Sequence, residues 1–229
     1  MKWKFCISVI LFAIAIIFSF PVNVSAMTTG FETESIPFEK AKKIYDKIYL
    51  RYESEEFPCH SIKCFDVSNS GLIAIGIDED TEKHINVYDN NGTFQYGYSF
   101  ETQGTYGIEF DDNNLIIYFV RGNDACLIDS EGNFIEMCVI TNTAENNSYW
   151  QHNVYAKSKS IGNSKYVLSK PIMFSPSYTK LTKISSDGAE FVIIDVSTEF
   201  FVFVIIVVII ALIIVVISIL CMLNYFKAN

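Results

Sequence analysis

The sequence predicts a mainly β protein, in which three antiparallel β-sheet repeats lie between an N-terminal amphipathic helix and a C-terminal transmembrane helix. Three observations support this prediction. Apolar residues recur at every second position through the middle of the chain, as in strands with one buried face. Two kinds of turn-forming segment alternate along this middle part. An uncharged apolar stretch then occupies residues 200–223.

The first segment, residues 1–26, has the pattern of a secretory signal peptide. Lys2 and Lys4 precede an apolar run over residues 5–20, and Val24-Ser25-Ala26 supplies the small residues of a signal peptidase site. An uncleaved N-terminal anchor is the alternative, but about 16 apolar residues are short for a hydrocarbon core of about 30 Å. We therefore expect cleavage after Ala26, which makes Met27 the first residue of the mature protein.

The next segment, residues 27–57, is predicted to contain an amphipathic helix over residues 36–52 with Ser35 as its N-cap. Its apolar face consists of Ala41, Ile44, Tyr45, Ile48 and Tyr52, and its other face carries Lys40, Lys42, Lys43, Lys47 and Arg51. Two interpretations follow. Either the apolar face packs on the domain that follows and the lysines are solvated, or the cationic face is attracted to anionic lipid headgroups.

Residues 58–199 form the predicted extracellular β-repeat domain. The stretch VYDNNGTFQYGYSF from Val87 has counterparts in LIDSEGNFIEMC from Leu127 and KISSDGAEFVII from Lys183. In each stretch an apolar run enters a cluster of Asp, Asn, Ser and Gly and resumes with an aromatic residue. The glycine permits a positive φ and the short polar side chains close the turn, so each stretch predicts a β-hairpin.

A second family of turns alternates with the first, in FDVSNSGLIAIG from Phe65, EFDDNNLIIYFV from Glu109 and KSIGNSKYVLSK from Lys159. These starting points lie 44 and 50 residues apart, which is the length of one four-stranded blade of a β-propeller. The run NLIIYFV, from Asn114, is apolar on both faces and predicts a central strand. Each repeat is therefore expected to form a small antiparallel sheet.

Over residues 62–196 this pattern resembles the NHL-type repeats of β-propellers. It is also similar to a group of uncharacterised single-span surface proteins of Gram-positive bacteria, in VYDNNGTFQYGYSF and in NLIIYFVRG. The resemblance implies propeller-like sheets and carries no assigned function. Three repeats are too few to close a ring, so we expect an incomplete propeller whose open ends are covered by residues 141–158 and by the N-terminal helix. A two-sheet sandwich is the alternative architecture.

The apolar stretch at residues 200–223 is predicted to be a transmembrane helix. Its 24 residues carry no charge and would extend about 36 Å as a helix. It lacks the polar face of a helix packed on a domain. Asp195 and Glu199 flank one end and Lys227 the other, which places the N-terminus outside the cell and residues 224–229 in the cytoplasm of a single-pass cell-membrane protein.

The charge of the exported part, residues 27–199, argues against a nucleic-acid partner. It contains all 26 acidic residues, but only 14 of the 17 basic ones, because Lys2, Lys4 and Lys227 lie elsewhere. The difference between 14 and 26 gives a net charge of −12. Nucleic-acid phosphates would be repelled by such a domain.

Four cysteines, Cys59, Cys64, Cys126 and Cys138, remain in the exported part. One prediction is local disulfides, Cys59 with Cys64 and Cys126 with Cys138. The other is that all four are free thiols packed as small hydrophobic residues. No metal site or cofactor is predicted, because His60, His84 and His152 each stand outside a zinc-binding motif.

The candidate ligand-binding residues are Tyr149, Trp150, His152 and Tyr155, which lie in the irregular segment 141–158. Aromatic residues in polar loops are common in binding sites, although such residues more often belong to the core. Catalytic residues are not predicted, since the chain contains no nucleophile elbow, P-loop or dinucleotide-binding glycine pattern.

These observations favour a non-enzymatic single-pass membrane protein whose extracellular domain binds another protein of the same envelope or forms a homodimer. An enzyme that acts on cell-wall or other glycans is one alternative, and it would need two carboxylates roughly 5 to 9 Å apart in an aromatic cleft. An accessory subunit of a membrane transporter is the other alternative.

Overall fold

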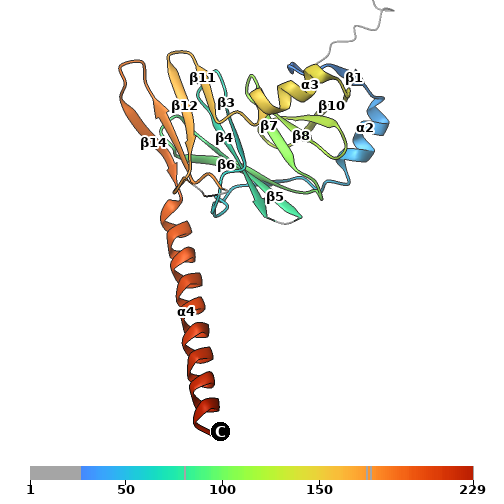
Figure 1. The fold of residues 1–229 in the computed structure, drawn as a ribbon. Coiled ribbons are helices and arrows are strands. Elements are labelled where there is room, and N and C mark those ends of the chain that lie inside the picture. The colour runs from blue at the N-terminus through green and yellow to red at the C-terminus, as the bar shows by residue number, and fades with distance from the viewer. Residues whose placement is uncertain (1–26, 80, 174, 176, 229) are drawn as a thin grey trace, which may run out of the picture.

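The protein consists of three antiparallel β-sheets followed by one long helix that extends away from them (Figure 1). A computed structural model describes residues 27–228 except 80, 174 and 176. The predicted signal peptide, residues 1–26, lies outside the described residues. The mainly β prediction is confirmed, and the domain has three sheets, not the two of a sandwich.

Each sheet is built around four consecutive strands. Sheet one contains β3 (Cys64–Val67), β4 (Ile73–Glu79), β5 (Glu82–Tyr88) and β6 (Phe94–Glu101), with β2 (Arg51–Glu53) paired outside β6. Sheet two contains β7 (Tyr106–Asp111), β8 (Asn114–Phe119), β9 (Asp124–Ile128) and β10 (Phe134–Ile140), with β1 (Thr33–Ser35) outside β10. Sheet three contains β11 (Ser158–Ile161), β12 (Ser164–Ser169), β13 (Lys180–Ile184) and β14 (Glu190–Asp195).

The first strands of the three sheets meet at the centre of the domain, where β3 contacts both β7 and β11. Sheet one therefore lies between the other two, as Figure 1 shows. One apolar cluster fills the space between sheets one and two, including Phe100, Tyr106 and Ile117. A second fills the space between sheets one and three, including Phe65, Ile75 and Leu181.

The predicted hairpin turns are confirmed. Gly92, Gly132 and Gly188 adopt φ values of 79°, 81° and 83°, between β5 and β6, β9 and β10, and β13 and β14. In the first of these turns, Asp89 Oδ1 accepts hydrogen bonds from the backbone N–H groups of Asn91 and Thr93 at 2.8 and 2.9 Å. The short polar side chain thus closes the turn, as the sequence predicts.

The N-terminal helix is shorter than predicted. Helix α2 covers only Phe38–Tyr45, and its N-cap is Pro37, which makes no side-chain hydrogen bond, in place of Ser35. Tyr52 belongs to β2, where it pairs with Tyr98 of β6. Between these elements the chain turns, with Tyr49 at a φ of 48°, before β2 pairs with the edge of sheet one.

Helix α2 packs on sheet two through its apolar face. The Phe134 ring of β10 lies 5.7 Å from the Phe38 ring and 5.0 Å from the Tyr45 ring, and Ala41 is buried. Of the two interpretations of the amphipathic pattern, this contact agrees with the one in which the apolar face packs on the domain that follows.

The segment after β10 covers the outer face of sheet two. It forms helix α3 (Ala144–Tyr149) and a π-helical turn, η1 (Trp150–Val154). Thr143 caps α3 by accepting a hydrogen bond from the backbone of Asn146 at 3.2 Å. Beneath this cover, Phe31, Tyr118 and Val154 belong to a third apolar cluster.

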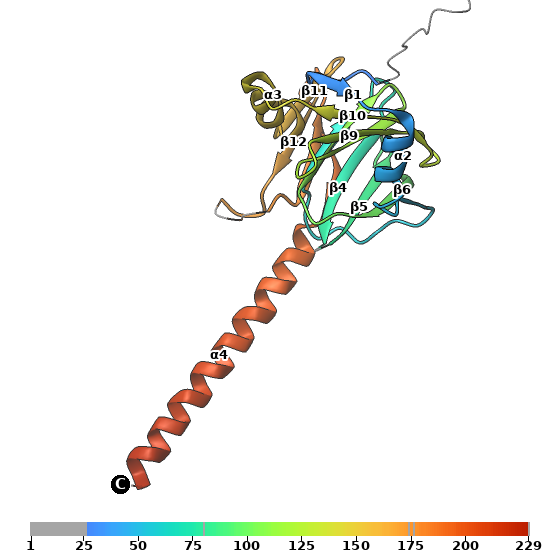
Figure 2. The same cartoon turned by 90° about the vertical axis from the view of Figure 1, so that its right-hand side faces the viewer.

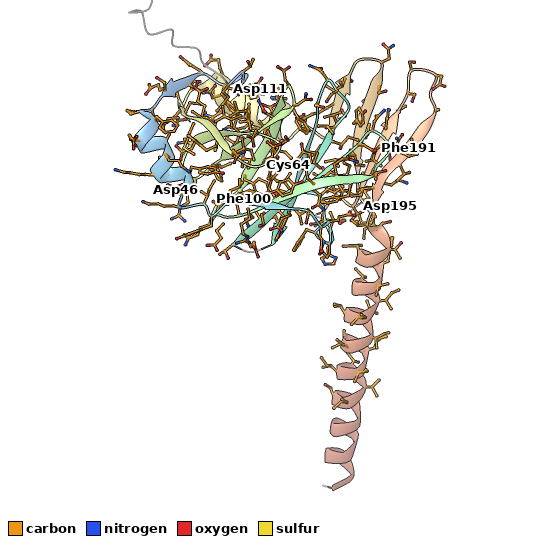
Figure 3. The ribbon with its side chains drawn as sticks, turned by 180° about the vertical axis from the view of Figure 1, so that it is seen from behind. Asp46, Cys64, Phe100, Asp111, Phe191 and Asp195 are labelled. Atoms are coloured by element: carbon orange, nitrogen blue, oxygen red, sulfur yellow. The ribbon has the colours of Figure 1, made fainter. Side chains whose placement is uncertain are left out.

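The last element, α4, covers Ser197–Ala228. Its part Phe200–Ser218 is long and apolar enough to cross a membrane. Asp195, at the end of β14, marks the place where the domain meets this helix (Figure 3). In both Figures 1 and 2 the helix leaves one end of the three-sheet domain, and the described N-terminal segment lies toward the other.

Candidate functional site

The four candidate ligand-binding residues are divided between two pockets and the apolar cover of sheet two, although the rings of Trp150 and Tyr155 stack 5.7 Å apart. Trp150 packs into the cover of sheet two, with its ring 4.9 Å from Phe31 and 5.6 Å from Tyr118. Tyr149 lies in the same cover and donates hydrogen bonds to the carboxylate of Glu109. His152 lines one pocket and Tyr155 lines another.

The His152 pocket has a volume of about 270 Å³ and contains a cluster of charges at the centre of the domain. Each sheet contributes one member from its first strand. Lys159 Nζ of β11 lies 2.8 Å from Asp66 Oδ1 of β3 and 4.0 Å from Glu109 Oε1 of β7. All three side chains are largely buried. We call these three residues the central ion cluster.

Every member of the central ion cluster has further partners. Asp66 Oδ2 accepts a hydrogen bond from the backbone N–H of Phe110 at 2.6 Å. Glu109 accepts from the hydroxyl groups of Tyr118, at 2.6 Å, and Tyr149, at 3.0 Å. Burial raises the pKa of Glu109, and the hydrogen bond from Tyr118 and the charge of Lys159 oppose that shift.

This arrangement bears on the enzymatic alternative. Since both distances share Lys159 Nζ, 2.8 and 4.0 Å place Asp66 Oδ1 and Glu109 Oε1 at most 6.8 Å apart. Two carboxylates at such a separation are needed by a glycosidase. Here, however, a lysine lies between them and neutralises charge that a general acid and base would use. The geometry is that of a buried, compensated network joining the three sheets.

The Tyr155 pocket is larger, about 490 Å³, and is lined mainly by segments that connect the strands, together with Asp78 of β4. The pocket opens between the chain entering β3, the link from β6 to β7, the chain entering β11, and the link from β12 to β13. A backbone hydrogen bond of 2.8 Å from Ile62 to Tyr178 joins two of these segments. Its lining residues are Ser61, Ile62, Lys63, Asp78, Thr105, Tyr155, Lys157, Ser177 and Tyr178.

Cations gather around this larger pocket, which we call the lysine pocket. Lys157 Nζ lies 4.6 Å and Lys170 Nζ 5.3 Å from the centre of the Tyr178 ring. Asp78 pairs with Lys63 at 3.5 Å and also with Lys83. Among the residues that the structure describes, no carboxylate pairs with Lys157 or Lys170. Partial burial lowers the pKa of Lys157, and the charges of Lys170 and Lys63 lower it further.

The four cysteines are buried, and neither of the two predicted local disulfides is present. Cys126 faces the cluster between sheets one and two, whereas Cys138 faces the cluster on the other side of sheet two. The predicted disulfide between them therefore does not form. Cys64 lies near the centre of the domain (Figure 3) and Cys59 packs between sheets one and three. Burial raises the pKa of the Cys64 thiol to about 12, which makes it unreactive.

Sequence reasoning missed both charged clusters. For the central ion cluster a signal was present, because the three stretches that begin at Phe65, Glu109 and Lys159 each carry a charged residue in the first strand of a repeat. Aligning the three stretches places Glu109 and Lys159 at the same position, whereas Asp66 falls one residue later. The lysine pocket has no such signal, since its residues come from connecting segments of different lengths.

The fold and these pockets define a class of protein: a domain of three antiparallel sheets, joined at a charged centre and followed by an apolar helix. No family model and no curated protein matches this chain. Within the described residues, no group of three His, Cys, Asp or Glu side chains is placed to hold a metal ion.

Proposed function

We propose that this protein is a single-pass membrane protein whose three-sheet domain faces the outside of the cell and binds another protein of the same envelope, without catalysing a reaction. The junction between the domain and α4 supports this proposal. Val196 donates a backbone hydrogen bond to Thr179 at 2.9 Å, and Asp195 Oδ1 accepts one from the backbone of Ser197 at 3.0 Å. These bonds hold the domain at one end of the apolar helix.

The arrangement of the sheets supports the propeller-like part of the proposal. In each sheet four consecutive strands follow one another from the inner edge outward, as in the blades of a propeller. We infer an open arc of three blades. Helix α3 and η1 cover the free face of sheet two. The free face of sheet three carries the polar residues Ser160, Lys165 and Thr182 together with Val167, Ile184 and Val192.

The main support for the binding of a partner is the outer edge of sheet three, which no described strand covers. Sheets one and two each gain a fifth strand from an upstream segment, whereas no described strand pairs outside β14. Phe191 and Val192 on β14 are 47% and 42% exposed, and Figure 3 shows Phe191 on the outer side of the domain. An uncovered edge presents unpaired N–H and C=O groups, which accept a strand from another chain.

Photo-crosslinking in native membranes tests this proposal. A photo-reactive amino acid replaces Phe191 in one full-length variant and Phe38 in a matched control, because Phe38 is 63% exposed on α2, which packs on sheet two. We expect an adduct from position 191 and none from position 38. An adduct of twice the mass of the chain would identify a homodimer, and any other mass an envelope partner.

Absence of an adduct at position 191, or equal adducts at both positions, contradicts binding at the β14 edge. N-terminal sequencing of the same preparation tests the topology. We expect Met27 as the first residue, and a sequence beginning at Met1 would contradict export by a cleaved signal peptide.

A glycan-acting enzyme is the second candidate, favoured by the one pocket that contains Asp66, Glu109 and His152. Its test is hydrolysis of purified cell-wall glycan by the wild-type chain and by Glu109→Gln. Release of sugar by the wild type that Glu109→Gln abolishes would replace the binding proposal. The compensated charges of the central ion cluster lead us to expect no hydrolysis by either.

A further inference from the structure

The lysine pocket lies at the end of the domain from which α4 leaves. Tyr178, in its wall, precedes Thr179, whose carbonyl group accepts the hydrogen bond from Val196 beside α4. Figures 1 and 2 both show the link between β12 and β13 at this end of the domain. The wall of the pocket is therefore hydrogen-bonded, one residue away at Thr179, to the residue that precedes α4.

The balance of charge in this pocket is opposite to that of the domain. Residues 27–199 have a net charge of −12, yet Lys63 and Lys157 line this pocket, and Lys157 and Lys170 both lie over the Tyr178 ring. The carboxylate that lines the pocket, Asp78, is shared between Lys63 and Lys83. Bringing like charges together costs free energy unless an anion compensates them.

The other polar groups of the pocket suit a particular anion. Ser61, Thr105 and Ser177 line it beside the lysines, and their hydroxyl groups can donate hydrogen bonds. Ammonium and hydroxyl donors around one space are the groups that proteins use to bind phosphate. An excess of more than one positive charge also suits a dianion better than a single carboxylate.

We propose that the lysine pocket binds a phosphate group. Two sources have this chemistry, the headgroup of a phospholipid in the same membrane and a soluble phosphate. The link that carries Lys170 also carries Ile172 and Met173, which are 49% and 84% exposed. Exposed apolar side chains on a link at the α4 end of the domain favour the lipid source, and that part rests on the proposed membrane span. Phosphate binding itself rests neither on the span nor on a partner at the β14 edge.

The test follows the reactivity of Lys157 in the full-length chain, assembled in lipid nanodiscs. An amine-acylating reagent reacts only with the neutral amine, and the products are quantified by mass spectrometry. A bound phosphate raises the pKa of Lys157, and a rise of one unit lowers the neutral fraction about tenfold. Lys165, exposed on the free face of sheet three, is the internal reference.

Three arms distinguish the sources. The first contains phosphatidylcholine discs alone, the second adds phosphatidic acid to the discs, and the third adds inorganic phosphate to the phosphatidylcholine discs. Sodium chloride keeps the ionic strength equal in every arm. We expect acylation of Lys157 to slow by about tenfold with phosphatidic acid, while that of Lys165 is unchanged. Slowing with inorganic phosphate alone would support phosphate binding and overturn the lipid source.

Lys170→Met supplies the matched variant, because Lys170 is exposed and its loss leaves the packing of the domain in place. This variant should lose most of the protection of Lys157, whereas Lys165→Met should keep it. Unchanged acylation of Lys157 in both the lipid and the phosphate arms would overturn the proposal. Equal protection in the two variants would do so as well. Neither result would bear on the crosslinks expected from position 191.

Discussion

The central ion cluster and the lysine pocket lie in the same domain, but their lysines differ in whether a carboxylate lies beside them. In the cluster, Lys159 is buried between Asp66 and Glu109, and backbone and tyrosine groups satisfy the remaining oxygens. In the pocket, Lys157 and Lys170 are more exposed and pair with no described carboxylate. A compensated cluster joins sheets, whereas an uncompensated one remains open to a ligand. We therefore interpret the central ion cluster as a structural feature and the lysine pocket as a binding site.

The largest effect is expected from removing the cation of the central ion cluster. Lys159→Met leaves Asp66 and Glu109 buried without a counter-charge, and we expect the free energy of unfolding to fall by about 3 to 5 kcal/mol. Lys157→Met, the matched change in the lysine pocket, should alter it by less than about 0.5 kcal/mol. Denaturant unfolding of the full-length variants measures both. Equal losses in the two variants would show that the two sites do not differ in this way.

A smaller loss of stability is expected from substitutions in the uncharged contact between the turn at Gly92, in sheet one, and β14, in sheet three. A Cβ atom on Gly92 would lie 2.8 Å from the carbonyl oxygen of Ile193, whereas one on Gly188 would meet nothing within 4 Å. Both glycines have φ near 80°. Gly188→Ala should therefore cost about 1 kcal/mol for the backbone alone.

Gly92→Ala should cost more, about 2 to 3 kcal/mol, because β14 must move as well. Thermal unfolding of the two variants gives the comparison. Equal melting temperatures would show that contact between this turn and β14 contributes nothing to the joint between the sheets.

The smallest effect is the dependence of stability on pH that Glu109 confers. Burial raises its pKa above the ordinary value of 4.5, partly offset by Tyr118 and Lys159. The folded state therefore holds this proton more tightly than the unfolded state. Its contribution is present below pH 4.5 and is lost as the pH rises through the raised pKa.

Relative to Glu109→Gln, which does not titrate, the wild-type chain should lose stability as the pH rises above 4.5, the ordinary pKa of the group. Unfolding by urea at several pH values measures this difference. A difference that grows in the opposite direction would mean that Lys159 outweighs burial, and that the cluster favours the charged carboxylate.

The sequence predicted best where local chemistry determines the structure. Gly92, Gly132 and Gly188 predicted three hairpins, because few other residues adopt the positive φ that these turns require. It predicted the helix over residues 36–52 less well, because the pairing of Tyr52 with β6 depends on an edge that is distant in sequence. Cys126 and Cys138 were close enough along the chain to suggest a disulfide, but the strand register turns them to opposite faces.

The candidate site was the least predictable part. The aromatic residues Tyr149 and Trp150 drew attention as loop residues, yet they close the core of sheet two. Lys157 and Lys170 belong to no sequence motif, and only the fold brings them to the same tyrosine ring. Pockets made by connecting segments depend on how whole sheets pack, and no local pattern encodes that packing.

The direct passage from β14 into α4 limits how far this protein can reach. Val196 is the single residue between the two elements, and one residue of extended chain covers only about 3.5 Å. With α4 in a bilayer, the domain could neither lift away from the surface nor swivel on a flexible stalk. Its encounters would then occur within a layer one domain thick, by lateral diffusion. Targets deep in a surrounding wall would have to come to it.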